Sequence, residues 1–389
     1  MEWLAARGHE VRVVTTPPYY PAWRVSEAYS WWKYSRESSQ AGAEVYRCPL
    51  WVPEKPSGLT RVLHLSSFAV SSLPVMLALA SWRPDVVLTV EPAFTSTSVA
   101  LLAGVLAGAP VWLHVQDFEV DAAFDLGLLP AGGAIQRLAL RHERLVMRCF
   151  SRVSTISSRM VERLLQKGIE PSRAVHFPNW VNIEAVYPMN EPSPLRDELG
   201  IGRDEVVLLY SGNMGAKQGL EILPELAARL RGHGGLHFVF CGDGAYRMQL
   251  EQVVAGFENV SFLPLQPVER LNELLNAADI HLLPQRAGAA DLVMPSKLTG
   301  MLASGRPVIA TAAEGTQIAR AVEGCGIVVE PGEAEAMARA VELLASNDEL
   351  RQKMGYAARI YAEKELARDG VLRRFESALK AAADDTAAS

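Results

Sequence analysis

Short apolar runs rich in β-branched residues alternate with helix-like segments along most of the chain. This alternation is typical of parallel sheets whose two faces are covered by helices. In the first half it predicts strands at 11–16, 44–50, 85–90, 110–116 and 152–157. In the second half it predicts strands at 206–212, 237–244, 260–266, 279–285, 306–311 and 326–331. The pattern therefore predicts an α/β protein with two doubly wound, Rossmann-like domains facing a cleft, where small ligands usually bind.

Helical periodicity fills the intervals between these strands. The clearest predicted helices lie at 59–82, 94–108, 132–150, 158–167, 333–345, 349–364 and 369–382. Residues 176–194 are rich in proline and asparagine and show no sustained period, which is typical of a connection between domains. We therefore expect an N-terminal domain at 1–180, a C-terminal domain at 181–365, and a final helix with a polar tail at 366–389.

The chain begins inside a supersecondary unit. Residues 2–6 are good helix formers, Gly8 is a helix stop, and the first predicted strand follows. In a βαβ protein a strand and a loop normally precede such a helix, and that loop is the usual site for an anion or nucleotide. We expect the first strand of the N-terminal domain to be missing and the natural product to start upstream.

The composition is that of an ordinary soluble globular protein. The 389 residues are 49% hydrophobic and 21% charged, with a net charge of −6. Scattered basic residues and an acidic sum argue against binding of nucleic acid. The cysteines show no CxxC spacing, so we expect buried, reduced thiols of a cytoplasmic protein. They are Cys48, Cys149, Cys241 and Cys325.

One stretch, 63–80, resembles a membrane span, and no signal peptide is visible before it. Pro74, His64 and four serines interrupt the stretch, so it predicts a helix buried against a sheet. The alternative is a helix with one face on lipid, which would place the protein at the inner face of the cytoplasmic membrane. The tryptophans nearest in sequence are Trp31, Trp32, Trp51 and Trp82.

The segment YSGNMGAKQGLEIL, 210–223, runs from a strand through a glycine-rich turn into a helix expected to start near Lys217. Gly212, Gly215 and Gly219 allow a backbone to approach a ligand, and the helix start and Lys217 supply positive charge. The segment predicts a phosphate cradle without Walker A or GxGxxG spacing. The alternative is a structural turn with a surface lysine.

The segment FCGDGAYRMQL, 240–250, repeats this arrangement after the next strand. Gly242 and Gly244 bracket Asp243, and a helix opens at Tyr246 and Arg247. Carboxyl ends of parallel strands share one edge of a sheet, so this loop should lie beside the first. Asp243 is a candidate ligand contact, although capping of backbone amides is the favoured interpretation of this residue.

The segment 284–311 offers a third helix start at a strand end. A loop of glycine and alanine carries Arg286 and Asp291, and Pro295 and Ser296 then begin a helix at Lys297. Ser296 can cap that helix while its free amides and Lys297 face an anion. Three such helix starts in one domain together favour a diphosphate ligand more strongly than any one of them does.

The segment HVQDFEVDAAFDLG, 114–127, follows a predicted strand of the N-terminal domain with four carboxylates. Together with His114, these groups can position sugar hydroxyls or accept a proton; the absence of HxH or DxD spacing argues against a metal. The carboxylates are Asp117, Glu119, Asp121 and Asp125. We expect a function for at least one of His114 and Asp117, with Glu91 at the end of the neighbouring strand. The alternative is a solvated loop with capping aspartates.

Four segments together resemble the GT-B glycosyltransferases of family 4, and among them the bacterial colanic-acid-type exopolysaccharide glycosyltransferases. They are RGHEVRVVTTPPYYP, the linker HFPNWV, YSGNMGAKQG, and HLLPQRAG with ADLVMPSKL and TGMLASGRPVIAT. The resemblance extends from residue 1 to about 380. It implies a metal-independent retaining transferase without a cofactor, in which the C-terminal domain holds a nucleotide diphospho-sugar.

The resemblance also implies roles for individual residues. The N-terminal domain would hold a saccharide or polyprenyl-linked acceptor, with Glu91 and Glu119 on the acceptor side. His114 and Asp117 would orient the two substrates, and Lys217, which matches the lysine of the family motif, would assist the leaving diphosphate. The remaining donor contacts would come from Gly212, Asn213, Gly215, Gly242, Asp243, Arg286, Asp291, Pro295, Ser296 and Lys297.

Two positions depart from the family pattern. Asn213 stands near where many relatives carry arginine, and Gly300 stands where many carry a glutamate that contacts the ribose. Asp291 or a backbone group would then supply the ribose contact. Among donors, GDP-fucose is suggested by resemblance only. A nucleotide-sugar 2-epimerase and a nucleotide-sugar-binding subunit without activity remain the alternatives.

Overall fold

The computed structural model describes residues 1–20, 22–54, 58–91, 94–118, 133–215, 218–286 and 295–387. The chain divides into two compact units. Unit 1 comprises Met1–Ile156, Val161–Phe177 and Leu372–Ser389. Unit 2 comprises Ser157–Met160 and Pro178–Val371.

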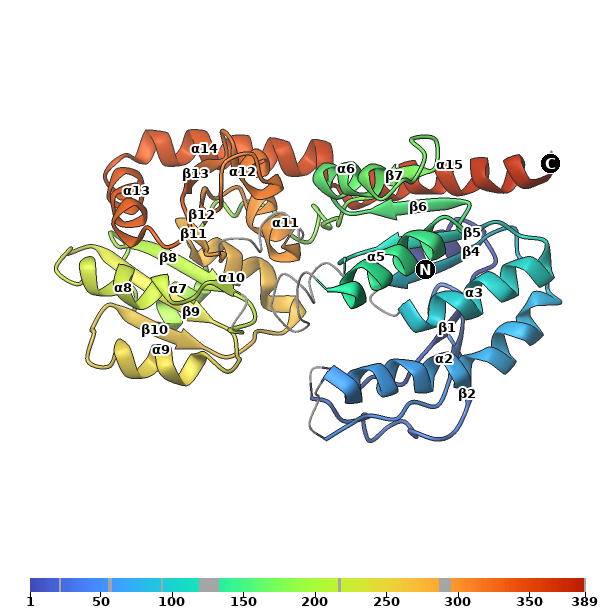
Figure 1. The fold of residues 1–389 in the computed structure, drawn as a ribbon. Helices are drawn as coiled ribbons and strands as arrows, with labels where there is room; N and C mark the ends of the chain where they lie inside the picture. The colour runs from blue at the N-terminus through green and yellow to red at the C-terminus, as the bar shows by residue number, and fades with distance from the viewer. Residues whose placement is uncertain are drawn as a thin grey trace. The chain divides into compact units, whose positions relative to one another are not determined.

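Unit 2 is built on a six-stranded parallel sheet of order β10-β9-β8-β11-β12-β13 (Figure 1). The strands are β8 (Val206–Ser211), β9 (Leu236–Cys241), β10 (Val260–Leu263), β11 (Ile280–Leu283), β12 (Val308–Thr311) and β13 (Gly326–Val329). The six strands predicted for the second half of the chain are all present. Their order reverses between β8 and β11, which defines the topological switch point of the sheet.

Helices cover both faces of this sheet (Figure 1). They are α7 (Pro194–Glu198), α8 (Ile222–Arg229), α9 (Arg247–Val253), α10 (Leu271–Ala277), α11 (Ser296–Ala303), α12 (Gln317–Val322), α13 (Ala334–Ser346) and α14 (Asp348–Tyr361), with short turns η2 (Val268–Arg270) and η3 (Ala362–Leu366). Side chains of β8 alternate between the two faces, as the period of two requires. Leu208 and Tyr210 join a core with α8 and α13, while Val207 and Leu209 join a core with α7 and α10.

The strands of unit 1 form two sheets where the sequence pattern predicted one. The first has the order β1-β3-β2 and the second the order β4-β5-β6-β7. The strands are β1 (Arg12–Thr15), β2 (Ser35–Ser38), β3 (Glu44–Arg47), β4 (Val87–Glu91), β5 (Val111–Val115), β6 (Arg152–Thr155) and β7 (Ala174–His176). Within the described residues, β1 pairs only with β3 and β4 only with β5, so no strand joins the two sheets.

The helices of unit 1 include the C-terminal one. They are α1 (Glu2–Ala5), α2 (Gly58–Ala80), α3 (Phe94–Ala107), α5 (Ala134–Met147), most of α6 (Ser158–Gln166) and, from Leu372, α15 (Arg368–Ala387). Phe375 of α15 packs edge-on against Trp112 of β5 and stacks on Phe177 at 3.9 Å between ring centroids. Glu376 of α15 accepts hydrogen bonds from Arg7 and His9 at 2.9 and 2.8 Å. These contacts tie α15 to unit 1.

Helix α2 is only partly buried, so the prediction of a helix buried against a sheet was wrong. By length and composition Thr60–Ala80 could cross a membrane, with a mean hydropathy of 1.8, and only 17% of this apolar segment is buried. Leu63, Val70 and Leu77 recur every seven residues, share one face and are 39–74% exposed. The helix packs mainly against α3, and the side chains of this face remain largely open to solvent.

Three of the four cysteines are buried and unpaired, as predicted. Cys149 is the exception. It lies just beyond the end of α5, where its thiol is exposed and donates to the Leu145 carbonyl at 3.4 Å.

Candidate functional site

The turns that follow β8 and β9 pack directly on each other at the carboxyl edge of unit 2. Gly212, Gly242 and Gly244 have φ of +135°, +143° and +149°, which side chains rarely adopt. A Cβ on Gly242 would lie 1.9 Å from the Gly212 carbonyl oxygen, and one on Gly244 2.6 Å from the Met214 carbonyl. The Gly212 amide also donates to the Cys241 carbonyl at 2.9 Å. The prediction that the two loops lie side by side is confirmed.

This packing changes what the glycines do. At Gly242 and Gly244 the space of the missing Cβ is taken by the neighbouring turn, whereas at Gly212 it meets only the Lys297 side chain, at 3.4 Å. At Gly219, with φ +64°, that space is taken by the backbone between Gln285 and Arg286, 2.7–2.9 Å away. Among the described atoms, a Cβ on Gly215 likewise meets nothing tighter than the Asn213 side chain, at 3.4 Å. Gly219, Gly242 and Gly244 therefore allow the ends of β8, β9 and β11 to pack closely together.

The helix after the first turn begins later than predicted. Helix α8 starts at Ile222, because the left-handed Gly219 interrupts the backbone before it. Lys217, the predicted first helical residue and candidate catalytic cation, lies outside the described residues, as does Asp291. Asn213 is described: its carbonyl accepts a hydrogen bond from the Tyr210 hydroxyl at 2.7 Å, which fixes the turn to β8.

The side chain of Lys297 extends from α11 to the carboxyl end of β8, at the topological switch point of the sheet. Its ammonium lies 4.4 Å from the centre of the Tyr210 ring, 3.4 Å from the Tyr210 hydroxyl and 3.3 Å from Oε1 of Gln218. The Lys297 Cδ lies 3.4 Å from the position of a Cβ on Gly212. Within the described part of the chain Lys297 forms no ion pair, and burial lowers its pKa to about 7. The structure therefore places, at the glycine turn, an ammonium without a counter-ion among the described residues.

The start of α11 differs in detail from the prediction. Pro295 is the N-cap and makes no side-chain cap, and Ser296 is the first helical residue rather than the cap. The Ser296 carbonyl accepts from the Thr299 hydroxyl at 2.8 Å, so the helix begins one residue before Lys297. At Asp243, Oδ1 accepts from the Gly244 amide at 2.7 Å, which confirms the capping interpretation favoured for this carboxylate.

Close packing of two helices explains the glycine at position 300. A Cβ there would lie 3.2 Å from Cδ1 of Leu275 on α10, so α11 and α10 approach closely at this point. The glutamate expected from the family pattern would require Leu275 to move.

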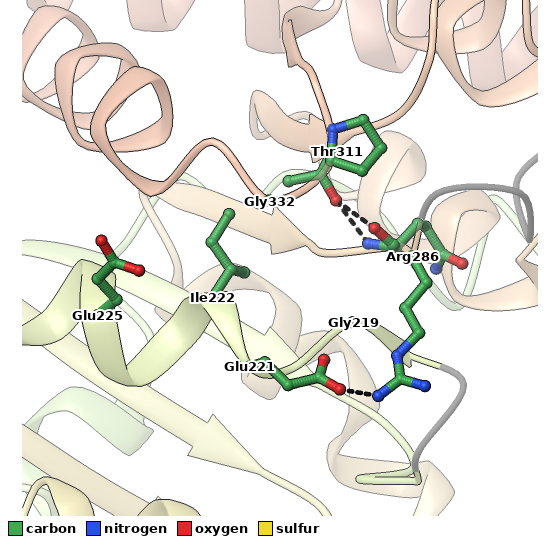
Figure 2. A pocket seen from close by; sticks show the side chains of 9 residues that line it. Gly219, Glu221, Ile222, Glu225, Arg286, Thr311 and Gly332 are labelled. Carbon is green, nitrogen blue, oxygen red and sulfur yellow. Dashed lines mark hydrogen bonds and ion pairs between the residues drawn. The ribbon is translucent and has the colours of Figure 1, made fainter.

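A pocket of about 300 Å³ adjoins the glycine turn on the β11–β13 side (Figure 2). Its lining residues are Gly219, Glu221, Ile222, Glu225, Gln285, Arg286, Thr311, Pro331 and Gly332. Arg286, a predicted donor contact, forms an ion pair with Glu221 at the mouth of this pocket. The Thr311 hydroxyl accepts a hydrogen bond from the backbone N–H of Gln285 at 2.6 Å and donates one to the backbone carbonyl of Gln285 at 2.8 Å. These two bonds hold the loop after β11.

In unit 1, His114 is the centre of a buried hydrogen-bond network. The Ser154 hydroxyl lies 2.8 Å from both the Trp112 indole nitrogen and His114 Nδ1. The Gln116 amide donates to His114 Nε2 at 2.7 Å, so the network suits a neutral imidazole with its proton on Nδ1. Burial lowers the His114 pKa to about 4. Both ring nitrogens are thus occupied by protein groups.

The other candidates of unit 1 lie near this network. Glu91 ends β4 and is 3% exposed, and the β4–β5 register sets it opposite Val115, next to His114. The structure therefore brings Glu91 and His114 to one edge of the sheet. Asp117 is partly buried two residues after β5. Glu119, Asp121 and Asp125 lie outside the described residues.

Several neighbours of the site were not predicted from the sequence. Tyr210 and Gln218 surround the Lys297 ammonium, and Ser154 links Trp112 to His114. A tyrosine in an otherwise apolar strand and a serine at a strand end are weak signals, because both residue types are common in cores and turns. Their partners lie 40 to 87 residues away in the sequence, which no local pattern reveals.

Comparison with known proteins adds independent evidence. Residues 1–180 match the family described as glycosyl transferase 4-like domain, and residues 193–361 match glycosyl transferases group 1. The chain is 42% identical over 385 residues to the Escherichia coli (strain K12) protein WcaI, which is assigned to colanic acid biosynthesis as a glycosyl transferase. The match covers 96% of this chain and 93% of WcaI.

Solved structures share the fold at lower identity. Sucrose-phosphate synthase from Thermosynechococcus elongatus has a TM-score of 0.76 at 19% identity, covering 100% of this chain and 92% of that one. Anabaena HepE, solved in complex with UDP and glucose, has a TM-score of 0.66 at 18% identity, covering 88% and 86%. The two doubly wound units predicted from the sequence are thus those of a GT-B fold. The chain belongs to the GT-B glycosyltransferases of family 4 and is a member of their colanic-acid-type exopolysaccharide branch.

Proposed function

We propose that this glycosyltransferase moves a hexosyl group from a nucleoside diphospho-sugar to a lipid-linked saccharide during assembly of an exopolysaccharide, with retention at the anomeric carbon. The donor would bind in unit 2, at the glycine turn after β8 and the start of α11. The acceptor would bind to unit 1. The relation to WcaI supports the pathway, and the complex of HepE with UDP and glucose supports the donor class.

The observation that carries this proposal is the Lys297 ammonium at the turn. A cation that forms no ion pair with the described residues, set beside a glycine turn and at the first turn of α11, is the environment that a diphosphate requires. The switch point of a doubly wound sheet is also where such ligands bind. Lys217 would add a second cation from the same turn. Positive side chains and amides would then stabilise the leaving diphosphate without a metal.

On the acceptor side, the proposal assigns His114 and Asp117 to the orientation of the reacting groups, with Glu91 and Glu119 beside them. The buried network holds His114 neutral with Nε2 toward Gln116. A sugar hydroxyl could donate to Nε2 only after Gln116 turns away. Substitution of Gln116 by alanine should therefore leave donor binding unchanged and alter the KM for the acceptor.

The first test is ligand binding by thermal unfolding with UDP, GDP, ADP and dTDP. A ligand that binds only the folded protein raises Tm by mass action. We expect one diphosphate to raise Tm selectively, Lys297→Gln to lose that shift, and the exposed control Lys364→Gln to keep it. If none of the four raises Tm, the proposed donor site is refuted.

The second test is the release of nucleoside diphosphate from the matching diphospho-sugar. Release that depends on lipid-linked saccharides extracted from bacterial membranes indicates transfer. Conversion of the donor to its epimer without an acceptor would instead indicate the 2-epimerase, and binding without turnover a non-enzymatic subunit. The anomeric configuration of the product, read by proton NMR, decides between retention and inversion.

Helix α2 supports a peripheral membrane contact for the same reaction. Its exposed stripe of Leu63, Val70 and Leu77 contains no charge, and Trp31 and Trp32 are each 59% exposed on unit 1. Apolar stripes and tryptophans of this kind favour the lipid interface. We expect co-sedimentation with phosphatidylglycerol vesicles that Val70→Glu abolishes and that Leu343→Glu, an exposed leucine of α13, leaves intact. If light scattering instead shows a dimer that Val70→Glu converts to a monomer, the stripe is the interface with a second copy of the chain.

A further inference from the structure

We propose that Lys297 takes up a proton when the donor diphosphate binds, so that donor binding is coupled to the protonation of a buried lysine. This inference rests on the proposed function, because it needs a diphospho-sugar at the turn after β8. It adds to that function a defined protonation step.

The geometry sets the ammonium among neutral groups. The Tyr210 ring covers one side, and the only polar atoms of the described chain within hydrogen-bond reach are the Tyr210 hydroxyl and Gln218 Oε1, at 3.4 and 3.3 Å. Both contacts are long for hydrogen bonds to a charged donor, which are usually about 2.7–2.9 Å. The protein groups around Lys297 therefore stabilise its charged form poorly.

A bound diphosphate would reverse this balance. A diphospho-sugar carries two negative charges, and an opposite charge within about 4–6 Å favours the protonated form of a lysine. Since burial holds the Lys297 pKa near 7, the lysine is largely neutral at pH 8 and becomes charged as the ligand enters. Binding of the donor then requires uptake of a proton from water.

Other groups around Lys297 do not account for such an uptake. The Tyr210 hydroxyl stays protonated throughout this range because burial raises its pKa, and Gln218 does not titrate. Asp243 is engaged by the Gly244 amide, and Arg286 is paired with Glu221. Lys217 and Asp291 belong to segments outside the described residues, so the experiment must separate Lys297 from them by substitution.

The chemical step then balances as follows. The bond between the sugar C1 and the β-phosphate oxygen breaks, and its electron pair goes to that oxygen. A bond forms between C1 and the acceptor oxygen, whose proton passes to the departing phosphate. Lys297 keeps its proton during transfer and stabilises the negative charge that grows on the phosphate. It returns the proton to water when the nucleoside diphosphate leaves.

The test is isothermal titration calorimetry with a diphospho-sugar, whose phosphates do not titrate between pH 6 and 9. The probe is whichever of UDP-glucose, GDP-mannose and GDP-fucose gives the largest rise in Tm. Titrations in two buffers of different ionisation enthalpy, cacodylate and MES at pH 6.0 and Bicine and Tris at pH 8.5, give the number of protons taken up from the difference in apparent enthalpy. We expect about one proton at pH 8.5 and nearly none at pH 6.0, with affinity falling up to about tenfold per pH unit above pH 7.

Variants of Lys297 identify the group that takes up the proton and test its role in catalysis. Lys297→Arg, which stays charged, should bind without proton uptake and show a pH-independent affinity and kcat. Lys297→Gln should bind at least about tenfold more weakly and lower kcat, while Lys364→Gln should match the wild type in every respect. Binding by the wild type without proton uptake at pH 8.5 would overturn this inference and leave the proposed function standing. Uptake that persists in Lys297→Gln would assign the proton to another group, and would equally overturn it.

Discussion

The contact between the two glycine turns makes a sharp prediction for Gly242→Ala. The new Cβ would lie 1.9 Å from the Gly212 carbonyl oxygen, whereas real Cβ atoms stay at least 3.0 Å from such atoms. The turn after β8 must therefore move by about 1.1 Å or more, the difference between these distances. The residue must also adopt φ +143°, which is strained for any L side chain.

The expected cost follows from these two effects. Backbone strain of this kind costs about 1–3 kcal/mol. The displaced turn weakens the bonds from Gly212 to Cys241 and from Met214 to Asp243, each worth about 1 kcal/mol. The sum is about 3–5 kcal/mol, which for a unit of about 200 residues lowers Tm by about 6–20 °C.

Gly256→Ala is the matched control. Gly256 also has a positive φ, +80°, but a Cβ there meets nothing within 4 Å, so only strain remains. That variant should lose about 1–2 kcal/mol. Circular dichroism during thermal unfolding and binding of the stabilising diphosphate measure both variants. If Gly242→Ala is as stable as Gly256→Ala and binds the diphosphate equally well, the close packing of the two turns is refuted.

Two protonation sites of unit 1 should be visible in urea unfolding at different pH. Burial holds the folded-state pKa of His114 near 4, below its unfolded value of about 6.5, so stability is present above pH 6.5 and is lost as pH falls toward 4. The loss should approach about 3 kcal/mol and be absent in His114→Gln, and equal slopes for the two proteins would contradict it. At Glu376, hydrogen bonds from His9, Lys380 and Arg7 lower the pKa to about 2. Glu376→Gln should therefore destabilise unit 1 at neutral pH, and its deficit should disappear as pH falls toward 2; a deficit that persists there would contradict the assignment.

The strands could be predicted well because their signal is local and strong. Eleven runs of β-branched residues gave eleven strands, since a buried parallel strand must be apolar along its whole length. The two unpredicted strands lack that signal. The strand β2 has the sequence SRES and lies at a sheet edge, and β7 has only three residues. Pairing with a neighbour defines such strands, and a neighbour cannot be inferred from four polar residues.

Helix α2 shows the opposite limit. Its apolar composition predicts a buried helix. The structure confirms the helix, but only 17% of its apolar window is buried. Apolar composition does not distinguish burial in protein from contact with lipid, because both environments exclude water from the same side chains. What covers such a helix depends on its surroundings in the cell, which the sequence of the helix does not specify.

The sequence predicted which loops of the candidate site lie side by side but not the contacts between them. The glycines and Lys297 were identified from the sequence as contacts of one diphosphate, but the packing of the glycines against neighbouring backbone was not predicted. In the structure the glycines at 212, 242 and 219 contact one another's turns or the loop after β11. They thereby fix the frame in which the single described cation of the turn, Lys297, reaches β8. The relevant contacts join segments about 30 to 90 residues apart, which sequence patterns cannot show.

This construction explains how the site tolerates two departures from the family pattern. Asn213 lacks the positive charge that many relatives carry there, and Gly300 lacks their carboxylate. The frame itself depends on backbone atoms and glycines, so neither change disturbs it. Lys297 reaches the same turn from another helix and can supply the missing charge, while Gly300 allows α11 to lie close to Leu275 and so sets where that lysine begins.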